Sequence, residues 1–160
     1  MDSFETWEST LLLSIELLAT LAFALSGIIE AARKRMDVVG VCVVGFLAAF
    51  GGGTLRDILL DQRPFFWVEN EIVLWAVLVL SIFSITFMRQ RHFQLTEKTL
   101  QWPDTLGLGL FTASGVAQSL ALDMPPTVAV LMGMITGIFG GVLRDIVCNE
   151  IPQSFRDHRP

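Results

Sequence analysis

The sequence lacks most of the features by which enzymes are recognised. Charged residues make up only 17% of its 160 residues, against about 25% in soluble domains. Neither histidine, His92 or His158, lies near a cysteine or carboxylate cluster with metal-ligand spacing. The sequence contains no phosphate-binding loop, dinucleotide fingerprint or nucleophile elbow. We therefore predict that the protein is not an enzyme and uses no metal or other cofactor.

Positive charge and cysteine are also scarce. The formal net charge is −5 and the isoelectric point is about 4.9, and no basic stripe is present, which excludes nucleic acid as a partner. The two cysteines, Cys42 and Cys148, lie in apolar stretches, where a thiol usually packs as a small hydrophobe. Residues 1–10 contain no lysine or arginine, so the first apolar run lacks the basic flank of a cleaved signal and is predicted to be a retained span.

What the sequence has in excess is long apolar segments. Hydrophobic residues make up 52% of the chain, and the mean hydropathy is +0.60. Helices satisfy their own backbone hydrogen bonds in lipid and cross a bilayer core with about 20 residues. We therefore predict an all-α polytopic membrane helix bundle surrounded by lipid. Its spans are 10–31, 38–60, 71–88, 104–122 and 126–148.

Basic residues are distributed unevenly between the segments that connect these spans. They follow the first, third and fifth spans, whereas the N-terminus and the turn between the fourth and fifth spans have none. The positive-inside rule places basic segments in the cytoplasm. We therefore predict an outside N-terminus and a cytoplasmic C-terminus. The residues that carry this prediction are Arg33, Lys34, Arg35, Arg89, Arg91, Lys98, Arg156 and Arg159.

Two stretches of the sequence recur at an offset of 88 residues. Gly52-Gly-Thr-Leu-Arg-Asp-Ile58 aligns with Gly140-Gly-Val-Leu-Arg-Asp-Ile146, and Phe23-Ala-Leu-Ser-Gly27 aligns with Phe111-Thr-Ala-Ser-Gly115. A shared Gly-Gly-x-Leu-Arg-Asp-Ile string does not arise easily by chance, even in apolar sequence. We conclude that the chain contains two related repeats.

An odd number of spans separates these repeats, so equivalent helices are predicted to cross the membrane in opposite directions. Inverted-topology repeats pack about a pseudo-two-fold axis, with the ion or substrate site between them. We predict a first three-helix repeat over 10–88, a cytoplasmic loop over 89–103 and a second repeat over 104–160. The counterpart of the third span would begin near residue 159, so we expect the second repeat to be truncated.

Small residues recur every four positions in the second and fifth spans. This spacing places them on one helix face, where two backbones can approach closely. We therefore expect these two spans to cross each other near the pseudo-two-fold axis. The residues of the two ladders are Gly45, Ala49 and Gly53, and Gly133, Gly137 and Gly141.

The consecutive glycines Gly51-Gly52-Gly53, echoed by Gly140-Gly141, have two interpretations. Each interior glycine costs a helix about 1 kcal/mol relative to alanine. The runs therefore predict a kink or break, with freed carbonyls that coordinate a cation beside a water-filled path. The alternative is close helix packing alone.

Charged pairs follow both glycine runs within one helical turn: Arg56-Asp57 and Arg144-Asp145. Charges within the membrane usually mark a functional site that faces the bundle interior. Each arginine could neutralise an aspartate across the pseudo-two-fold axis or stand in a pore. The alternative is that both pairs lie at span ends, partly solvated, and only anchor the helices.

Other polar residues lie within the spans at equivalent positions. Glu16, which aligns with Asp104, could give an outer vestibule negative potential, or it could be an interfacial carboxylate. Ser26 and Ser114 could donate their hydroxyls to freed backbone groups, or they could pack as small residues.

These strings together resemble the bacterial trimeric intracellular cation (TRIC) channel family, also catalogued as paired glycine transporter domains. The resemblance covers roughly residues 10–152. It implies two inverted three-helix repeats plus a final helix, in a homotrimer of the bacterial inner membrane with one pore per protomer for monovalent cations such as K⁺ or Na⁺. It also implies that the second and fifth spans kink at their glycines and line the pore. The sequence departs from the pattern at Phe139, which replaces the first glycine, and in lacking the last two helices.

Three functions are compatible with these features: a K⁺ channel, a secondary carrier of a small neutral solute such as glycine, and a non-conducting scaffold or fragment. Glycine would need paired counter-charges near the membrane midplane, whereas the Arg-Asp pairs lie toward opposite ends, so the sequence favours the channel. The predicted ion path comprises Ser26, Gly51, Gly52, Gly53, Thr54, Ser114, Gly140 and Gly141. The predicted gating or structural charges are Arg56, Asp57, Arg144 and Asp145.

Overall fold

The computed structural model of the chain describes residues 2–90 and 97–155. Over these residues the protein is all-α, as predicted. The helices are α1 (Asp2–Arg33), α2 (Val38–Leu59), α3 (Phe66–Glu69), α4 (Glu71–Gln90), α5 (Glu97–Ala121) and α6 (Pro126–Val147), followed by the 3-10 helix η1 (Gln153–Phe155).

The five long helices coincide with the five predicted spans, with two clear differences. α1 begins at Asp2 instead of 10. α5 begins at Glu97 instead of 104, so the predicted loop 89–103 is shorter than expected. The prediction followed apolar character, but a helix that leaves the bilayer core can continue through charged sequence, and here Pro103 lies inside it. Three of the basic residues used to orient the chain lie outside the described residues: Arg91, Arg156 and Arg159.

Among the described residues, three helical segments are long and apolar enough to cross a membrane: Thr10–Arg33, Val38–Leu59 and Pro126–Val147. A shorter apolar segment, Glu71–Phe87, lies within α4. The outer surface is correspondingly apolar. Ile72 is 84% exposed and Phe83 is 66% exposed, whereas Arg56 and Arg144 are buried. Apolar residues outside and charges inside are the distribution expected of a helix bundle in lipid.

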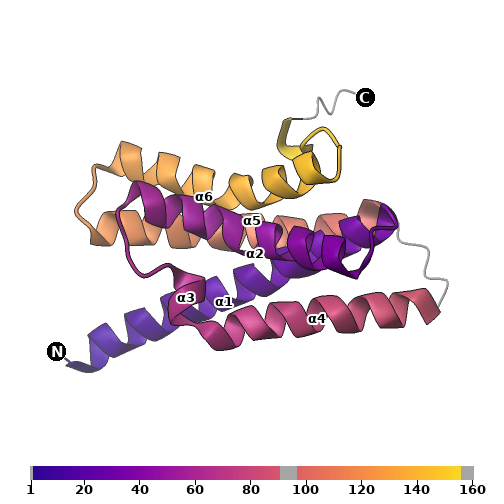
Figure 1. Cartoon of the computed structure of the whole chain (residues 1–160). Coiled ribbons are helices and arrows are strands. Elements are labelled where there is room, and N and C mark those ends of the chain that lie inside the picture. The colour runs from indigo at the N-terminus through magenta and orange to yellow at the C-terminus, as the bar shows by residue number, and fades with distance from the viewer. Residues whose placement is uncertain (1, 91–96, 156–160) are drawn as a thin grey trace.

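Four helices form the centre of the bundle, where α1 packs on α2 and α5, and α6 packs on the same two helices (Figure 1). α4 lies outside this group against α2 and α1. In Figure 1, α1 and α5 run in opposite directions, and so do α2 and α6. The helices that align at an offset of 88 residues are therefore antiparallel.

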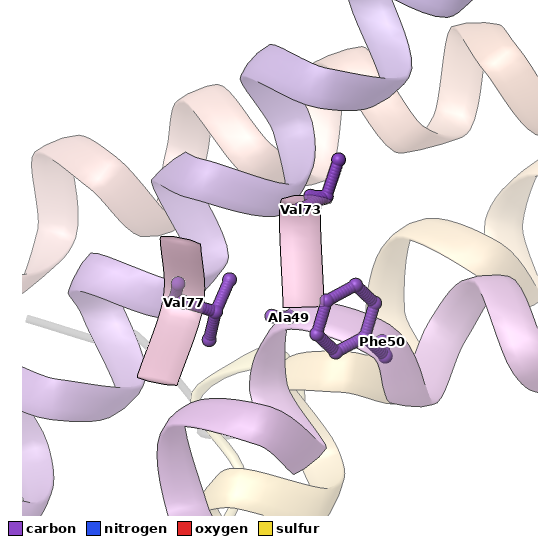
Figure 2. Close-up of a cluster of buried hydrophobic side chains, with 5 residues drawn as sticks. Ala49, Phe50, Val73 and Val77 are labelled. Carbon is purple, nitrogen blue, oxygen red and sulfur yellow. The ribbon is translucent and has the colours of Figure 1, made fainter. Parts of the chain in front are cut away.

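The contact between α2 and α4 is an apolar cluster. Ala49 and Phe50 on α2 pack with Val73 and Val77 on α4 (Figure 2). All four side chains are less than 9% exposed. This cluster holds α4 against α2 within the first repeat, and it leaves the other face of α2 for α6.

The backbone repeats in detail as well as in helix order. Arg35 and Asp123, 88 residues apart, both have a left-handed φ of 55°, at the turns after α1 and α5. Asp61 and Asn149, again 88 residues apart, have φ of 53° and 55° after α2 and α6. Short polar side chains such as Asp and Asn tolerate this conformation better than most residues. The two repeats therefore end their helices in the same way.

Candidate functional site

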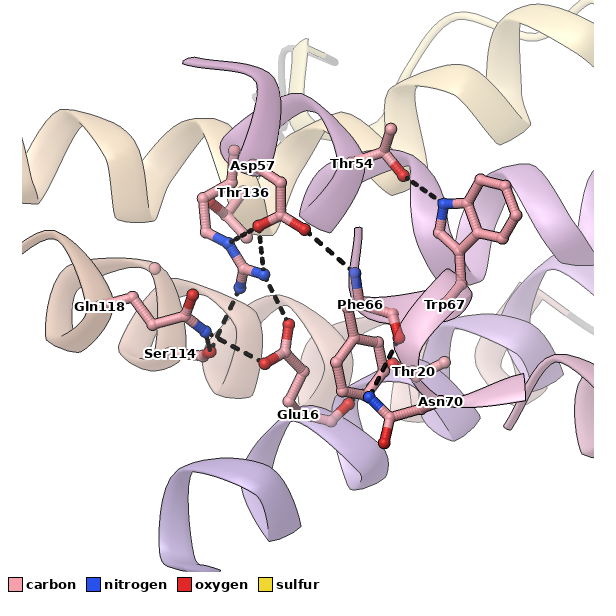
Figure 3. A network of polar contacts seen from close by, with 12 residues as sticks. Glu16, Thr20, Thr54, Asp57, Phe66, Trp67, Asn70, Ser114, Gln118 and Thr136 are labelled. Atoms are coloured by element: carbon pink, nitrogen blue, oxygen red, sulfur yellow. Dashed lines mark hydrogen bonds and ion pairs between the residues drawn. The ribbon is translucent and has the colours of Figure 1, made fainter. Parts of the chain in front are cut away.

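The first of two buried charge clusters surrounds Arg56, which is 2% exposed near the end of α2. Its Nε lies 2.8 Å from Asp57 Oδ1, and its Nη2 lies 2.7 Å from Glu16 Oε1 on α1 (Figure 3). Arg56 Nη1 donates to the Ser114 hydroxyl of α5 at 3.5 Å. The Gln118 amide donates to Glu16 Oε2 and to Ser114, both at 3.0 Å. These five residues, the Arg56 cluster, join α1, α2 and α5.

The second cluster surrounds Arg144, which is fully buried near the end of α6. Its Nε lies 2.7 Å from Asp145 Oδ1, and its Nη1 bonds both Asp104 on α5 and the Ser26 hydroxyl on α1. Ser26 donates to Asp104 Oδ1 at 3.0 Å. Arg144 Nη2 has no hydrogen-bond partner among the described residues. These four residues form the Arg144 cluster.

The two clusters are equivalent, because their main members differ by 88 residues: Glu16 and Asp104, Ser26 and Ser114, Arg56 and Arg144, Asp57 and Asp145. Each arginine bonds a carboxylate of its own repeat and the serine of the other repeat. The arginines therefore connect the two repeats through neutral hydroxyl groups.

These contacts correct four predictions. Neither arginine neutralises an aspartate across the pseudo-two-fold axis, because each pairs with the adjacent aspartate. The pairs are not partly solvated anchors, since Asp57 and Asp145 are 4% and 3% exposed. The serine hydroxyls bind arginine instead of freed backbone. Glu16, 6% exposed, is a buried partner of Arg56 and lies at no solvated interface.

The second oxygen of each aspartate fixes the chain beyond the helix end. Asp57 Oδ2 accepts a hydrogen bond from the Phe66 amide at 3.3 Å, at the start of α3. Asp145 Oδ2 accepts one from the Gln153 amide at 2.9 Å, at the start of η1. Each aspartate thus joins its buried arginine to the segment that follows the spanning helix.

The glycine runs do not break their helices. α2 and α6 are continuous α-helices from Val38 to Leu59 and from Pro126 to Val147. A Cβ built on Gly52 would lie 2.1 Å from the Thr136 carbonyl oxygen. A Cβ on the equivalent Gly140 would lie 2.4 Å from the carbonyl oxygen of Ala48. The glycines therefore permit close packing of α2 on α6, and the predicted helix break is wrong.

The four-residue ladders have a different role from the one predicted. A Cβ on Gly133 would lie 2.7 Å from the Thr112 carbonyl oxygen of α5. On Gly45 it would lie 3.1 Å from Ser81 Oγ of α4 and 3.3 Å from Ile28 of α1. These two ladder positions therefore face α1, α4 and α5, and they do not form the crossing between α2 and α6. That crossing is made by Gly52 and Gly140, which lie one position before Gly53 and Gly141.

The last glycine of each ladder faces a charge cluster. A Cβ on Gly53 would lie 3.8 Å from Arg56 Nη2, and on Gly141 it would lie 3.7 Å from Asp104 Oδ1. Beside Gly53 is a cavity of about 10 Å³, the space that one water molecule needs. The polar groups that line it come from Glu16, Thr20 and Thr54, and its aromatic walls are Phe50, Phe66, Trp67 and Phe111. Trp67 Nε1 donates to Thr54 Oγ1 at 3.2 Å (Figure 3).

One ion pair connects the repeats at the end of the bundle. Lys34, after α1, bonds Glu150, after α6. The hydrogen bond that Lys34 donates to Glu150 is the main cause that raises the pKa of Lys34 above its usual value of 10.5. The contact places the α1–α2 connection and the segment after α6 at the same end of the molecule.

Sequence reasoning missed Gln118 and did not assign the partners of Glu16 and Asp104. The offset of 88 residues could have indicated that Glu16 and Asp104 have equivalent roles, because it aligns these two carboxylates. It could not reveal Gln118, since the equivalent residue is Glu30, which bonds Arg33 at 2.8 Å. Partners that differ between the repeats follow only from the packed structure.

Comparison with known proteins decides the family. The family model described as "Glycine transporter" matches residues 13–89 and 101–160. The chain belongs to this family. The family is related to the TRIC channels, as the solved structures show. The chain is similar to a TRIC trimeric intracellular cation channel orthologue from Rhodobacter sphaeroides, with a TM-score of 0.85 and 34% identity, covering 93% of this chain and 76% of that one.

Two further members of this TRIC-related family support the assignment. A prokaryotic TRIC channel, solved in 0.5 M KCl, matches with a TM-score of 0.82 and 27% identity, covering 92% of this chain and 75% of that one. The UPF0126 inner membrane protein YadS of Escherichia coli K12 is 39% identical over 142 residues, which cover 89% of this chain and 68% of YadS. The matches are to membrane proteins and channels. The predictions that the protein lies in a membrane and is not an enzyme are therefore confirmed.

Proposed function

We propose that the protein is a monovalent cation channel of the bacterial inner membrane, with K⁺ as its main ion. The observation that carries this proposal is the similarity to the Rhodobacter TRIC channel, at a TM-score of 0.85 and 34% identity. The buried charge clusters support it independently. Polar groups inside a lipid-exposed bundle are costly and usually belong to an ion or solute path.

The proposed path runs through the centre of the bundle, where α2 and α6 meet α1 and α5. Each cluster contains one arginine and two carboxylates, so each carries an excess of one formal negative charge when all are ionised. Such an excess favours cations over anions. The residues we propose to line the path are Ser26, Gly53, Thr54, Ser114 and Gly141, with Gly51, Gly52 and Gly140 holding α2 against α6.

The described conformation is closed along this path. The cavity beside Gly53 holds one water molecule at most, which is too little for a hydrated cation. The close contact of Gly52 with the Thr136 backbone also closes the gap between α2 and α6 at their crossing point. Conduction therefore requires a rearrangement in which these helices bend or separate, and a glycine-based kink belongs to that state.

We further propose an inverted-topology arrangement with an outside N-terminus, a cytoplasmic C-terminus and three protomers. Antiparallel α1 and α5 and the basic segment after α1 support the orientation. The Lys34–Glu150 pair supports a common side for that segment and the chain after α6. The trimer comes from the similarity to channels that are described as trimeric.

A glycine carrier is less well supported. A carrier needs counter-charges for the carboxylate and ammonium of glycine, whereas Arg56 is already bound by Glu16 and Asp57. The test is parallel assay of the purified chain in liposomes for K⁺ flux and for labelled glycine uptake. The proposal predicts K⁺ flux that rises linearly with concentration and no glycine uptake. Saturable glycine uptake without K⁺ flux would overturn it.

A further inference from the structure

Phe23 and Phe111 form an aromatic stack at the centre of the bundle. Their ring centroids are 5.6 Å apart and the rings are inclined by 21°. The side chains are 1% and 2% exposed. The two residues occupy equivalent positions in the two repeats, 88 residues apart. Because each ring contacts its own counterpart, the stack lies on the pseudo-two-fold axis.

The stack separates the two charge clusters. Along α1, Phe23 lies between Glu16 and Ser26, which belong to the Arg56 and Arg144 clusters respectively. Along the antiparallel α5, Phe111 lies between Asp104 and Ser114, in the opposite order. The rings therefore lie between the clusters on both helices. A cation that moves from one cluster to the other inside the bundle must pass them.

Polar groups border the stack on both sides. Phe111 forms one wall of the water-sized cavity that Glu16 and Gly53 also line. On the other side, a Cβ on Gly141 would lie 3.7 Å from Phe23 Cε1 and 3.7 Å from Asp104 Oδ1. The two rings thus form an apolar layer between two polar environments.

Phe23 is held tightly in this position. A Cβ on Gly107 of α5 would lie 2.7 Å from Phe23 Cδ2, so the ring packs directly on the α5 backbone. Movement of the ring is therefore linked to movement of α1 along α5. One face of each ring is covered by the other ring, so that face is not open to an approaching cation.

We propose that the Phe23–Phe111 stack is the hydrophobic barrier of the cation path, an inference that rests on the proposed channel function. Phenyl rings have no oxygen to replace the hydration shell of a cation, so a dry constriction blocks permeation by dewetting. Separation of the rings as α1 and α5 shift opens the path. The identity of these two side chains then determines how often the path is wetted.

The test is K⁺ flux from liposomes that contain the purified full chain, as wild type, Phe23→Leu, Phe111→Leu and Phe111→Ala. Phe83→Leu is the matched control, because Phe83 is 66% exposed on the outer face of α4, where it stacks on Phe87 away from the Phe23–Phe111 pair. Circular dichroism and size-exclusion chromatography check that each variant is folded. The leucine variants are conservative enough to remain folded if the alanine variant does not.

The proposal predicts flux that rises with the ring volume removed, by roughly fivefold or more for Phe111→Ala, and no rise for Phe83→Leu. A wild type that conducts K⁺ at the same rate as folded Phe23→Leu and Phe111→Leu would overturn the barrier and leave the channel function intact. Silence of the wild type and of every folded variant would overturn the channel function itself, and the barrier with it.

Discussion

Gly52 of α2 lies directly against the backbone of Thr136 on α6, so closely that a Cβ on Gly52 would lie 2.1 Å from the Thr136 carbonyl oxygen. The equivalent contact of Gly140 with Ala48 has a corresponding distance of 2.4 Å. The obstacle is backbone in both cases and cannot move as a flexible side chain would. The crossing of α2 and α6 therefore depends on the absence of two side chains.

Substitution of either glycine tests this packing. Gly52→Ala and Gly140→Ala should destabilise the protein by about 1–3 kcal/mol, because overpacking forces backbone shifts. Gly109→Ala on α5 is the control, since nothing lies within 4 Å of its added Cβ. There the higher helix propensity of alanine should increase stability by up to about 1 kcal/mol. Thermal unfolding in detergent measures all three, and equal effects at Gly52 and Gly109 would contradict the account.

The Arg56 cluster should tolerate the loss of a whole ion pair better than the loss of one partner. Arg56→Met leaves Glu16 and Asp57 buried without their cation, so we expect a loss of about 3–5 kcal/mol. Adding Glu16→Gln should recover part of that loss. The exposed Arg35 provides a control, because Arg35→Met should change stability by less than about 0.5 kcal/mol. Additive losses in the double variant would argue against the pairing.

The Arg144 cluster can be improved, because within residues 2–90 and 97–155 Arg144 Nη2 has no hydrogen-bond partner, whereas Arg56 Nη2 binds Glu16. Asp104 is one methylene shorter than Glu16. Asp104→Glu should reach Nη2 and raise stability by about 1–3 kcal/mol, the cost of an unsatisfied buried donor. The reverse change, Glu16→Asp, should lower stability. A drop in melting temperature for Asp104→Glu would show that the site has no room for the longer carboxylate.

The Lys34–Glu150 pair predicts a loss of stability at alkaline pH. The folded state raises the pKa of Lys34, so its contribution is complete below the unfolded pKa of about 10.5. That contribution to stability is lost as the pH rises through the higher pKa that Lys34 has in the folded state. Melting temperatures between pH 9 and 12 should therefore fall more steeply for wild type than for Glu150→Gln. Parallel curves for the two proteins would exclude this linkage.

The helices could be predicted from the sequence because lipid demands long apolar runs, and the repeat because six residues recur in the string Gly-Gly-x-Leu-Arg-Asp-Ile. The structural role of the glycines could not be predicted from the sequence in the same way. A glycine run weakens an isolated helix, but the backbone of α6 at Thr136 offsets this cost by packing on α2. Only the tertiary structure shows which of these two effects decides the conformation.

The hydrogen-bond and ion-pair partners of the charged residues could not be predicted from the sequence either. Arg56 reaches Glu16 across 40 residues and Ser114 across 58 residues. The spacing places an arginine near a helix end, but it does not show which face of which helix it meets. The short helix α3 was missed for the same reason, because the Asp57 carboxylate that caps it belongs to another element.

The most direct test of the central claim is recording from the purified chain in a planar bilayer under a KCl gradient. A cation path between the two charge clusters predicts unitary currents that reverse near the K⁺ equilibrium potential. Neutralising the excess acidic charge of both clusters together, with Glu16→Gln and Asp104→Asn, should move that reversal potential toward zero. Currents that reverse near the Cl⁻ potential, or a reversal potential that is unchanged in this folded double variant, would contradict the account.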